Sequence, residues 1–147
     1  KNFTRPLVFA GVSKKNYLFW QATDNDCRTK WISQVSEADL AAIYRGAFCL
    51  VQPSIIEGYG YPPLEAMACG TPAIVSNIPV LLETSGGNAL AANPDNPGEW
   101  VEAIQALENS ELRKRMIDRG LSWVEPMKGR SGWRNHLSDI RELTDFD

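Results

Sequence analysis

Short apolar runs alternate along the chain with segments in which apolar residues recur every three or four positions. The first pattern predicts strands and the second predicts helices. The apolar runs predict strands over residues 6–11, 30–33, 48–51, 72–75 and 89–92. Helices are expected over residues 12–20 (behind a short loop), 36–47, 63–69, 97–108, 110–123 and 132–143. Strands and helices therefore alternate over most of the sequence.

Two of the predicted helices carry boundary signals. Ser36 and Asp39 have the spacing of a helix start, close to a capping box. Apolar residues follow them at helical spacing, namely Leu40, Ile43, Tyr44 and Ala47. Pro63 suits the first turn of the later helix, because its missing N–H costs nothing there. Gly70 ends that helix.

The order of elements predicts an α/β fold. The strands are short and apolar on both faces, which is typical of a parallel sheet flanked by helices on both sides. We therefore expect a Rossmann-like sheet in a single domain over residues 1–147, with 124–147 as a helical tail. Such sheets bind ligands beyond the carboxyl ends of their strands. The usable strands are few and the first begins almost at once, so we expect that the first part of this domain precedes the sequence.

The composition excludes two classes of function. The 15 Lys and Arg face 18 Asp and Glu, which gives a net charge of −3 and no basic footprint for nucleic acid. No apolar run approaches the length of about 18 residues that a transmembrane helix needs. Residues 1–6 lead into only a short apolar strand, so no signal peptide is expected.

The cysteine and histidine content predicts a reducing compartment. Cys27, Cys49 and Cys69 are odd in number and scattered, and His136 is a single histidine in a predicted helix. This pattern fits neither a disulfide framework nor a zinc site, so we expect a cytoplasmic protein. Small, mostly buried apolar positions are expected for the cysteines, and a structural or surface position for the histidine.

The segment from residue 52 to 72 combines a strand end, a glycine-bearing loop and a helix start. Gly58 and Gly60 let the main chain approach a ligand closely. The helix behind them offers N–H groups and the positive end of its dipole, which suits a diphosphate. The sequence therefore predicts an anion site at this turn.

Two carboxylates flank the glycines, eight positions apart. Glu57 lies on the loop and can face a ligand, while Glu65 is expected in the first turn of the helix, where it can accept hydrogen bonds from ribose hydroxyls. The alternative is that Glu65 only interacts with the helix dipole and that the spacing arises by chance. The ligand site is favoured because the glycines, the tandem prolines and a helix of small residues follow one another directly along the chain.

The segment resembles the signature of the family-four retaining glycosyltransferases, which have the GT-B fold. Their motif runs Pro-Ser-x-x-Glu-Gly-Phe-Gly-x-Pro-x-Leu-Glu-Ala-Met-Ala-x-Gly-x-Pro, and Tyr59 stands here for Phe. Residues 35–44 are similar to the family's Val-Ser helix entry, residues 74–83 to its next strand and loop, with Leu82 in place of Pro, and residues 93–97 to its following turn. The resemblance covers residues 7 to about 123 in order.

The resemblance implies the C-terminal, donor-binding half of a GT-B enzyme, with the acceptor domain absent. Glu57 is implied as the catalytic residue at the donor sugar. Donor-binding roles are implied for Gly58, Tyr59, Gly60, Tyr61, Leu64 and Glu65. The nucleobase is implied near Trp31, Ile32 and Ser33, although the preceding loop does not align and Trp31 suits the core equally well. Family members use an Arg and a Lys from an earlier strand-loop; Arg5, Lys14 and Lys15 lie in other elements.

The resemblance implies a retaining hexosyltransferase as the full-length protein and an inactive isolated fragment. The donor is a UDP-, GDP- or ADP-sugar, with no metal and no other cofactor. The acceptor is a glycan, lipid or small molecule bound by the absent domain, which leaves open a peripheral place at the inner face of the membrane. Alternatives are an epimerase or phosphorylase of the same two-domain fold, and a noncatalytic nucleotide-sugar-binding module that needs a partner chain.

Overall fold

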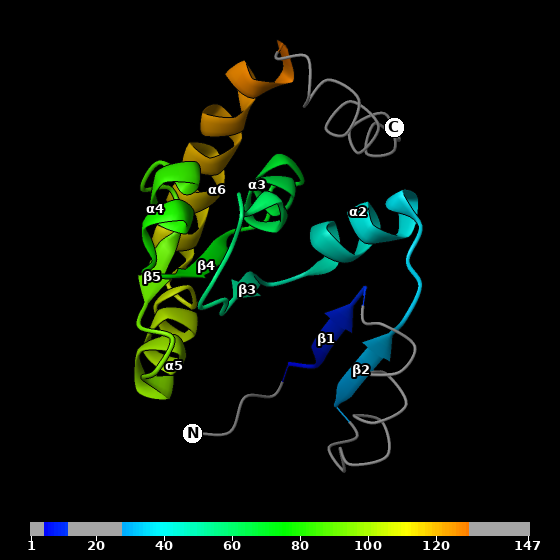
Figure 1. The fold of residues 1–147 in the computed structure, drawn as a ribbon, viewed down its shortest axis with the longest axis horizontal. Helices are drawn as coiled ribbons and strands as arrows, with labels where there is room; N and C mark the ends of the chain where they lie inside the picture. Colours follow the sequence, from blue (N-terminus) through cyan, green and yellow to red (C-terminus); the bar gives the residue numbers. More distant parts are fainter. Residues whose placement is uncertain (1–4, 12–27, 130–147) are drawn as a thin grey trace. The chain divides into compact units, whose positions relative to one another are not determined.

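The chain folds into two compact units, residues 1–40 and 41–147. A computed structural model describes residues 5–11 and 28–129 (Figure 1). The predicted helices at 12–20 and 132–143, together with Cys27 and His136, lie outside the described residues. The expectation of a single domain stays a prediction.

The first unit contains a two-stranded parallel sheet. β1 (Leu7–Ala10) pairs with β2 (Thr29–Ile32), and the register places Phe9 beside Trp31. Their rings stack with centroids 4.0 Å apart and planes 7° apart. The prediction of a buried first strand is wrong, because Leu7, Val8 and Phe9 are 37–51% exposed. A sheet of two strands leaves open to water the apolar surface that further strands or helices would cover.

The helix α2 (Glu37–Gly46) begins as predicted. The Asp39 main-chain N–H donates to Ser36 Oγ at 3.1 Å, and that hydroxyl donates to Asp39 Oδ2 at 2.6 Å. This reciprocal contact closes the first turn in the manner of a capping box. Ala41 and Tyr44 are the buried residues of the helix, and both lie in its second-unit part.

The second unit contains a three-stranded parallel sheet in the order β3-β4-β5. Its strands are β3 (Leu50–Gln52), β4 (Ala73–Ser76) and β5 (Leu90–Ala92). β4 is central and every residue of it is buried, as expected for a strand covered on both faces. The predicted boundary of β3 at residues 48–51 is wrong by two positions, because pairing with β4 begins only at Leu50.

Four α-helices accompany this sheet in the described part of the second unit, in addition to the end of α2. They are α3 (Tyr61–Ala68), α4 (Pro79–Ser85), α5 (Pro97–Ala106) and α6 (Ser110–Val124), and the short 3-10 helix η1 (Glu125–Gly129) follows α6. The predicted helices over 97–108 and 110–123 are confirmed, except that α5 ends two residues earlier, at Ala106. α4 was not predicted from the sequence.

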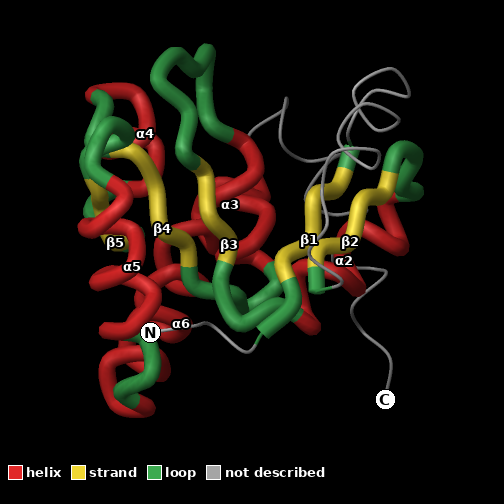
Figure 2. Tube along the Cα trace, turned by 90° about the horizontal axis from the view of Figure 1, so that it is seen from below, coloured by secondary structure: helices red, strands yellow, loops and turns green. Residues whose placement is uncertain are grey.

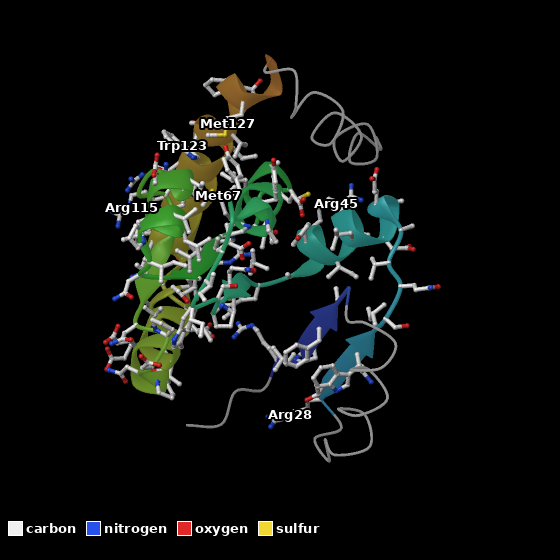
Figure 3. The ribbon with its side chains drawn as sticks, in the orientation of Figure 1. Arg28, Arg45, Met67, Arg115, Trp123 and Met127 are labelled. Atoms are coloured by element: carbon white, nitrogen blue, oxygen red, sulfur yellow. The ribbon has the colours of Figure 1, made fainter. Side chains whose placement is uncertain are left out.

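The core of the second unit lies on both faces of its sheet. Alternate residues of β4 point to opposite faces. Val75 packs with α3, α4 and the end of α6, whereas Ile74 packs with α5 and the first half of α6. Met67 of α3, with Trp123 and Met127, belongs to the first of these faces (Figure 3).

These observations confirm an α/β, Rossmann-like fold with parallel strands flanked by helices. Of the helices described, none is both long enough and apolar enough to span a membrane.

Candidate functional site

The loop between β3 and α3 leaves the carboxyl end of its strand, where parallel sheets bind ligands. It covers residues 53–60 and extends beyond the end of β3 before the chain enters α3 (Figure 2). Exposed aliphatic residues occupy its first half, since Ile55 and Ile56 are 68% and 86% exposed. The glycines and Glu57 follow directly.

Gly60 has a conformation that requires glycine. Its φ of 90° and ψ of 53° lie in the left-handed region, and it is the N-cap of α3. A Cβ atom here would also lie 2.5 Å from Leu81 Cδ2 of α4. Gly58 differs, because nothing lies within 4 Å of its would-be Cβ. Gly60 therefore serves the turn and its close packing, while Gly58 leaves open space on the loop.

Glu57 is held by its neighbours on the loop and by the last residue of β3. The Gln52 amide donates from Nε2 to Glu57 Oε2 at 3.0 Å and to Ser54 Oγ at 2.8 Å. The main-chain N–H of Gly58 donates to Glu57 Oε1 at 3.3 Å. Both carboxylate oxygens thus accept hydrogen bonds at the mouth of the turn.

Glu65 lies in the second turn of α3, so the predicted first-turn position is wrong. The helix begins at Tyr61, two residues before the predicted start, which leaves no acidic residue in its first turn. Glu65 is 5% exposed, and its Oε2 accepts a hydrogen bond from the Tyr44 hydroxyl at 2.9 Å. An ionisable group buried in a helix is costly unless it is hydrogen-bonded, and such groups gather at functional sites.

Burial raises the pKa of the Tyr44 hydroxyl well above its usual range, and the nearby Glu65 charge raises it further. The hydroxyl therefore remains a donor at any physiological pH.

Cys69 lies at the end of α3, and its thiol pKa is raised to about 11. Burial is the largest cause; Arg45 opposes the shift and the Glu65 charge adds to it.

The start of α3 offers few N–H groups. Pro62 and Pro63 have none, so the N–H groups at this helix start belong to Gly60 and Tyr61. The side chains of Tyr59 and Tyr61 are 42% and 45% exposed, and their ring centroids are 4.7 Å apart. Leu64 is completely buried in the core, so its side chain presents no surface to a ligand.

The predicted nucleobase region lies in the first unit. Trp31 and Ile32 end β2, and Ser33 follows it. Trp31 is half-buried and stacks on the exposed ring of Phe9. The donor motif lies in the second unit, and the nucleobase assignment stays a prediction.

Sequence reasoning missed two residues that contact the carboxylates. Gln52 carried a signal, because polar residues at the carboxyl end of a parallel strand border the usual ligand position. Tyr44 was part of the helix-entry pattern but had no role there. Its contact with Glu65 joins residues 21 positions apart.

Other potential sites are few in the part of the chain that the structure describes. No group of three or more His, Cys, Asp or Glu residues among residues 5–11 and 28–129 could hold a metal ion. A shallow groove of about 380 Å³ is lined by Asn88, Asp118, Arg119, Ser122 and Trp123, and none of these belongs to the 52–72 segment.

Fold and site together define an α/β protein with a glycine turn and two hydrogen-bonded carboxylates at the carboxyl end of a parallel strand. The family of glycosyl transferases group 1 matches residues 4–123. The chain belongs to this family, and the resemblance found in its sequence is confirmed.

Two similar mannosyltransferases agree with this assignment. The O-antigen chain mannosyltransferase B of Escherichia coli is 35% identical over 136 residues, which cover 88% of this chain and 34% of that protein. The O-antigen chain mannosyltransferase RfbU of Salmonella typhimurium is 46% identical over 81 residues, covering 55% of this chain and 23% of that protein. The chain thus spans only about a quarter to a third of the length of these two relatives.

A solved structure supports the fold. Sucrose-phosphate synthase from Thermosynechococcus elongatus superposes with a TM-score of 0.72 at 24% identity, covering 94% of this chain and 37% of that one. At this identity the likeness concerns the GT-B type of fold.

Proposed function

We propose that this chain is the donor-binding part of a retaining hexosyltransferase that takes its sugar from a nucleoside diphosphate sugar. The observation that carries the proposal is the left-handed, buried Gly60 at the start of α3, between two carboxylates held by hydrogen bonds. The main-chain N–H groups of Gly60 and Tyr61 remain at this turn, and such groups can approach the oxygens of a diphosphate.

The two carboxylates have different roles in this proposal. Glu57, partly exposed and held by Gln52, faces the donor sugar near the bond that breaks. Glu65 accepts hydrogen bonds from the ribose hydroxyls, as acidic residues do in other nucleotide sites. Gly58, Tyr59, Gly60 and Tyr61 contact the sugar and diphosphate, and Leu64 supports the turn from the core.

Sugar transfer leaves negative charge on the departing diphosphate, and preorganised donors stabilise such charge best. The turn at Gly60 supplies part of this stabilisation. The family resemblance assigns the rest to an Arg and a Lys that are not identified in this chain. We therefore propose that the acceptor site and the basic pair lie outside these 147 residues.

Mannose is the first sugar to test, because two of the relatives are named as mannosyltransferases of O-antigen chains. Other relatives are named as D-inositol 3-phosphate glycosyltransferases, for example in Corynebacterium glutamicum, with 31% identity over 107 residues. UDP-, GDP- and ADP-sugars all remain in the test set.

A thermal-shift screen of UDP-, GDP- and ADP-sugars tests the proposal. A donor at about 100 times its Kd stabilises the folded state by about 2.7 kcal/mol through mass action, which raises the unfolding midpoint by several degrees. Free mannose and inorganic phosphate serve as controls. An unchanged midpoint with every nucleotide sugar would contradict the proposal.

A further inference from the structure

We propose that Tyr44 is a positioning residue for Glu65, and that it sets the preference of the site for a ribose with both hydroxyl groups. The inference rests on the proposed function of the donor site and adds to it a residue from a different helix.

The contact itself is buried. Tyr44 lies near the end of α2, in the part of that helix that belongs to the second unit, and Glu65 lies in α3. The Tyr44 hydroxyl donates to Glu65 Oε2 at 2.9 Å, and the two residues are 7% and 5% exposed. A hydrogen bond to an ionised carboxylate in a low-dielectric setting is stronger than a bond between neutral groups.

Tyr44 is itself fixed by a second contact. The hydroxyl of Thr71, which is 2% exposed, donates to the main-chain oxygen of Tyr44. The main-chain N–H of Thr71 donates to Ala66 O at 2.8 Å, next to Glu65 in α3. A chain of hydrogen bonds therefore runs from α3 through Thr71 to Tyr44 and back to the Glu65 carboxylate.

The direction of the contact is fixed as well. Because burial and the Glu65 charge hold the tyrosine pKa far above the physiological range, the phenol keeps its proton and can only donate to the carboxylate. A carboxylate has about four acceptor positions on two oxygens. Fixing one oxygen sets the plane of the group, and with it the directions in which the carboxylate accepts further donors.

Vicinal ribose hydroxyls are a matched pair of such donors. A carboxylate of fixed orientation distinguishes a diol from a sugar lacking both hydroxyls, because the loss of donors leaves a buried polar group without those bonds. A tyrosine that only stabilises the fold would instead affect the binding of every nucleotide equally. This difference allows the two roles to be separated.

The test compares Tyr44→Phe with the unaltered protein in isothermal titration calorimetry. The probes are GDP, UDP and ADP, together with the 2′,3′-dideoxy form of each. The unaltered protein should bind the ribose form of its nucleotide at least about tenfold more tightly than the dideoxy form. Tyr44→Phe should lose most of that preference while its affinity for the dideoxy form changes less than about twofold.

A matched control removes another buried hydroxyl in the same unit. Ser85 is 1% exposed and donates to Leu81 O at 2.6 Å, so Ser85→Ala has a comparable structural cost without touching Glu65. This variant should keep the full preference for ribose. Thr71→Val removes the hydrogen bond to the Tyr44 main chain but leaves the Tyr44 hydroxyl in place. This variant should lose part of the preference for ribose, and it serves as the second test if Tyr44→Phe does not fold.

The possible results distinguish a failure of the proposed function from a failure of the positioning role of Tyr44. If the unaltered protein binds none of the six nucleotides, the proposed function fails. If it prefers ribose and Tyr44→Phe keeps that preference, or weakens ribose and dideoxy forms equally, the proposed function stands and the positioning role of Tyr44 is overturned.

Discussion

At the scale of single residues, the two glutamates occupy opposite environments. Glu57 lies on a partly exposed loop among polar donors, whereas Glu65 is buried against a tyrosine. Environments that differ in this way let two identical side chains carry out different tasks. In the proposed reaction the exposed group meets the sugar, and the buried group holds the nucleoside.

Replacing Gln52 should affect turnover more than binding. Gln52→Leu keeps the side-chain volume but removes the amide that donates to Glu57 at 3.0 Å. A lost hydrogen bond to a charged group lowers kcat about tenfold or more, while donor affinity changes less than about twofold. Steady-state kinetics of the complete enzyme measure both, and Gln105→Leu in α5 is the control. An unchanged kcat would contradict the assignment of Glu57 to the chemical step.

Cys69 should react slowly with alkylating reagents. Its pKa is raised from about 9 to about 11, and the thiolate is the reactive form. At pH 8 the folded protein should therefore be alkylated at Cys69 on the order of a hundredfold more slowly than the urea-unfolded chain. Peptide mass spectrometry over time measures the rates, and equal rates in both states would exclude the shift.

The same shift has a consequence for stability. Folding raises the pKa of this thiol, so the neutral thiol contributes to the free energy of unfolding. That contribution is fully present below about pH 9 and is lost as the pH rises toward 11. The urea midpoint should fall over this range, and it should fall less in Cys69→Ala, where only other groups such as Tyr44 titrate. A fall of the same size in both proteins would show that Cys69 does not contribute.

At the scale of elements, two neighbouring glycines after α4 provide a matched comparison. Gly86 and Gly87 have φ values of 56° and 70°, which residues other than glycine rarely adopt. A Cβ at Gly86 would overlap the indole ring of Trp123, which is fixed by its Nε1 donating to Thr84 O at 2.8 Å. Nothing lies within 4 Å of a Cβ at Gly87.

Gly86→Ala should therefore be much more destabilising than Gly87→Ala. Gly87→Ala costs about 1–2 kcal/mol for the left-handed backbone alone, and Gly86→Ala adds a steric clash that brings the loss to about 3 kcal/mol or more. Urea unfolding measures both variants. Equal losses would mean that α6 does not pack on this turn as described.

Local signals predict the starts of α2, α5 and α6 but place the start of α3 two residues late, at Pro63. The start of β3 depends on pairing with β4 and does not follow from the sequence. Asn96 and Asn109 cap the starts of α5 and α6, because their side chains accept hydrogen bonds from the main-chain N–H groups of Gly98 and Leu112. β3 begins later than its apolar run, because Leu50 is the first residue whose register matches β4. α4 begins with Pro79 and ends at Gly86, both typical helix-boundary residues, although the family resemblance implies a loop there.

The candidate site was predictable as a segment but not as a set of contacts. The glycines, prolines and glutamates of the motif are adjacent in sequence, so a resemblance could locate them. The Tyr44–Glu65 hydrogen bond depends on how α2 packs against α3, and the Gln52–Glu57 bond depends on the path of the loop. Neither follows from spacing along the chain.

At the scale of the whole molecule, the chain covers 34% of the E. coli mannosyltransferase to which it is similar. Under the proposed function, the acceptor site lies in the remainder of such an enzyme. The isolated chain of 147 residues should therefore bind a nucleotide sugar but transfer no sugar. Release of nucleoside diphosphate from UDP- and GDP-sugars measures this, and turnover above the buffer rate would contradict the division of labour.

The central claim is that the turn at Gly60 binds the diphosphate of a nucleotide, and chemical-shift mapping of the ¹⁵N-labelled chain tests it most directly. On addition of GDP, UDP or ADP, whichever the chain binds, the amide signals of Gly58, Gly60 and Tyr61 should shift in a saturable manner, while that of Gly87 should not. Shifts confined to the groove around Arg119, or no shifts at the turn at saturating nucleotide, would contradict the account.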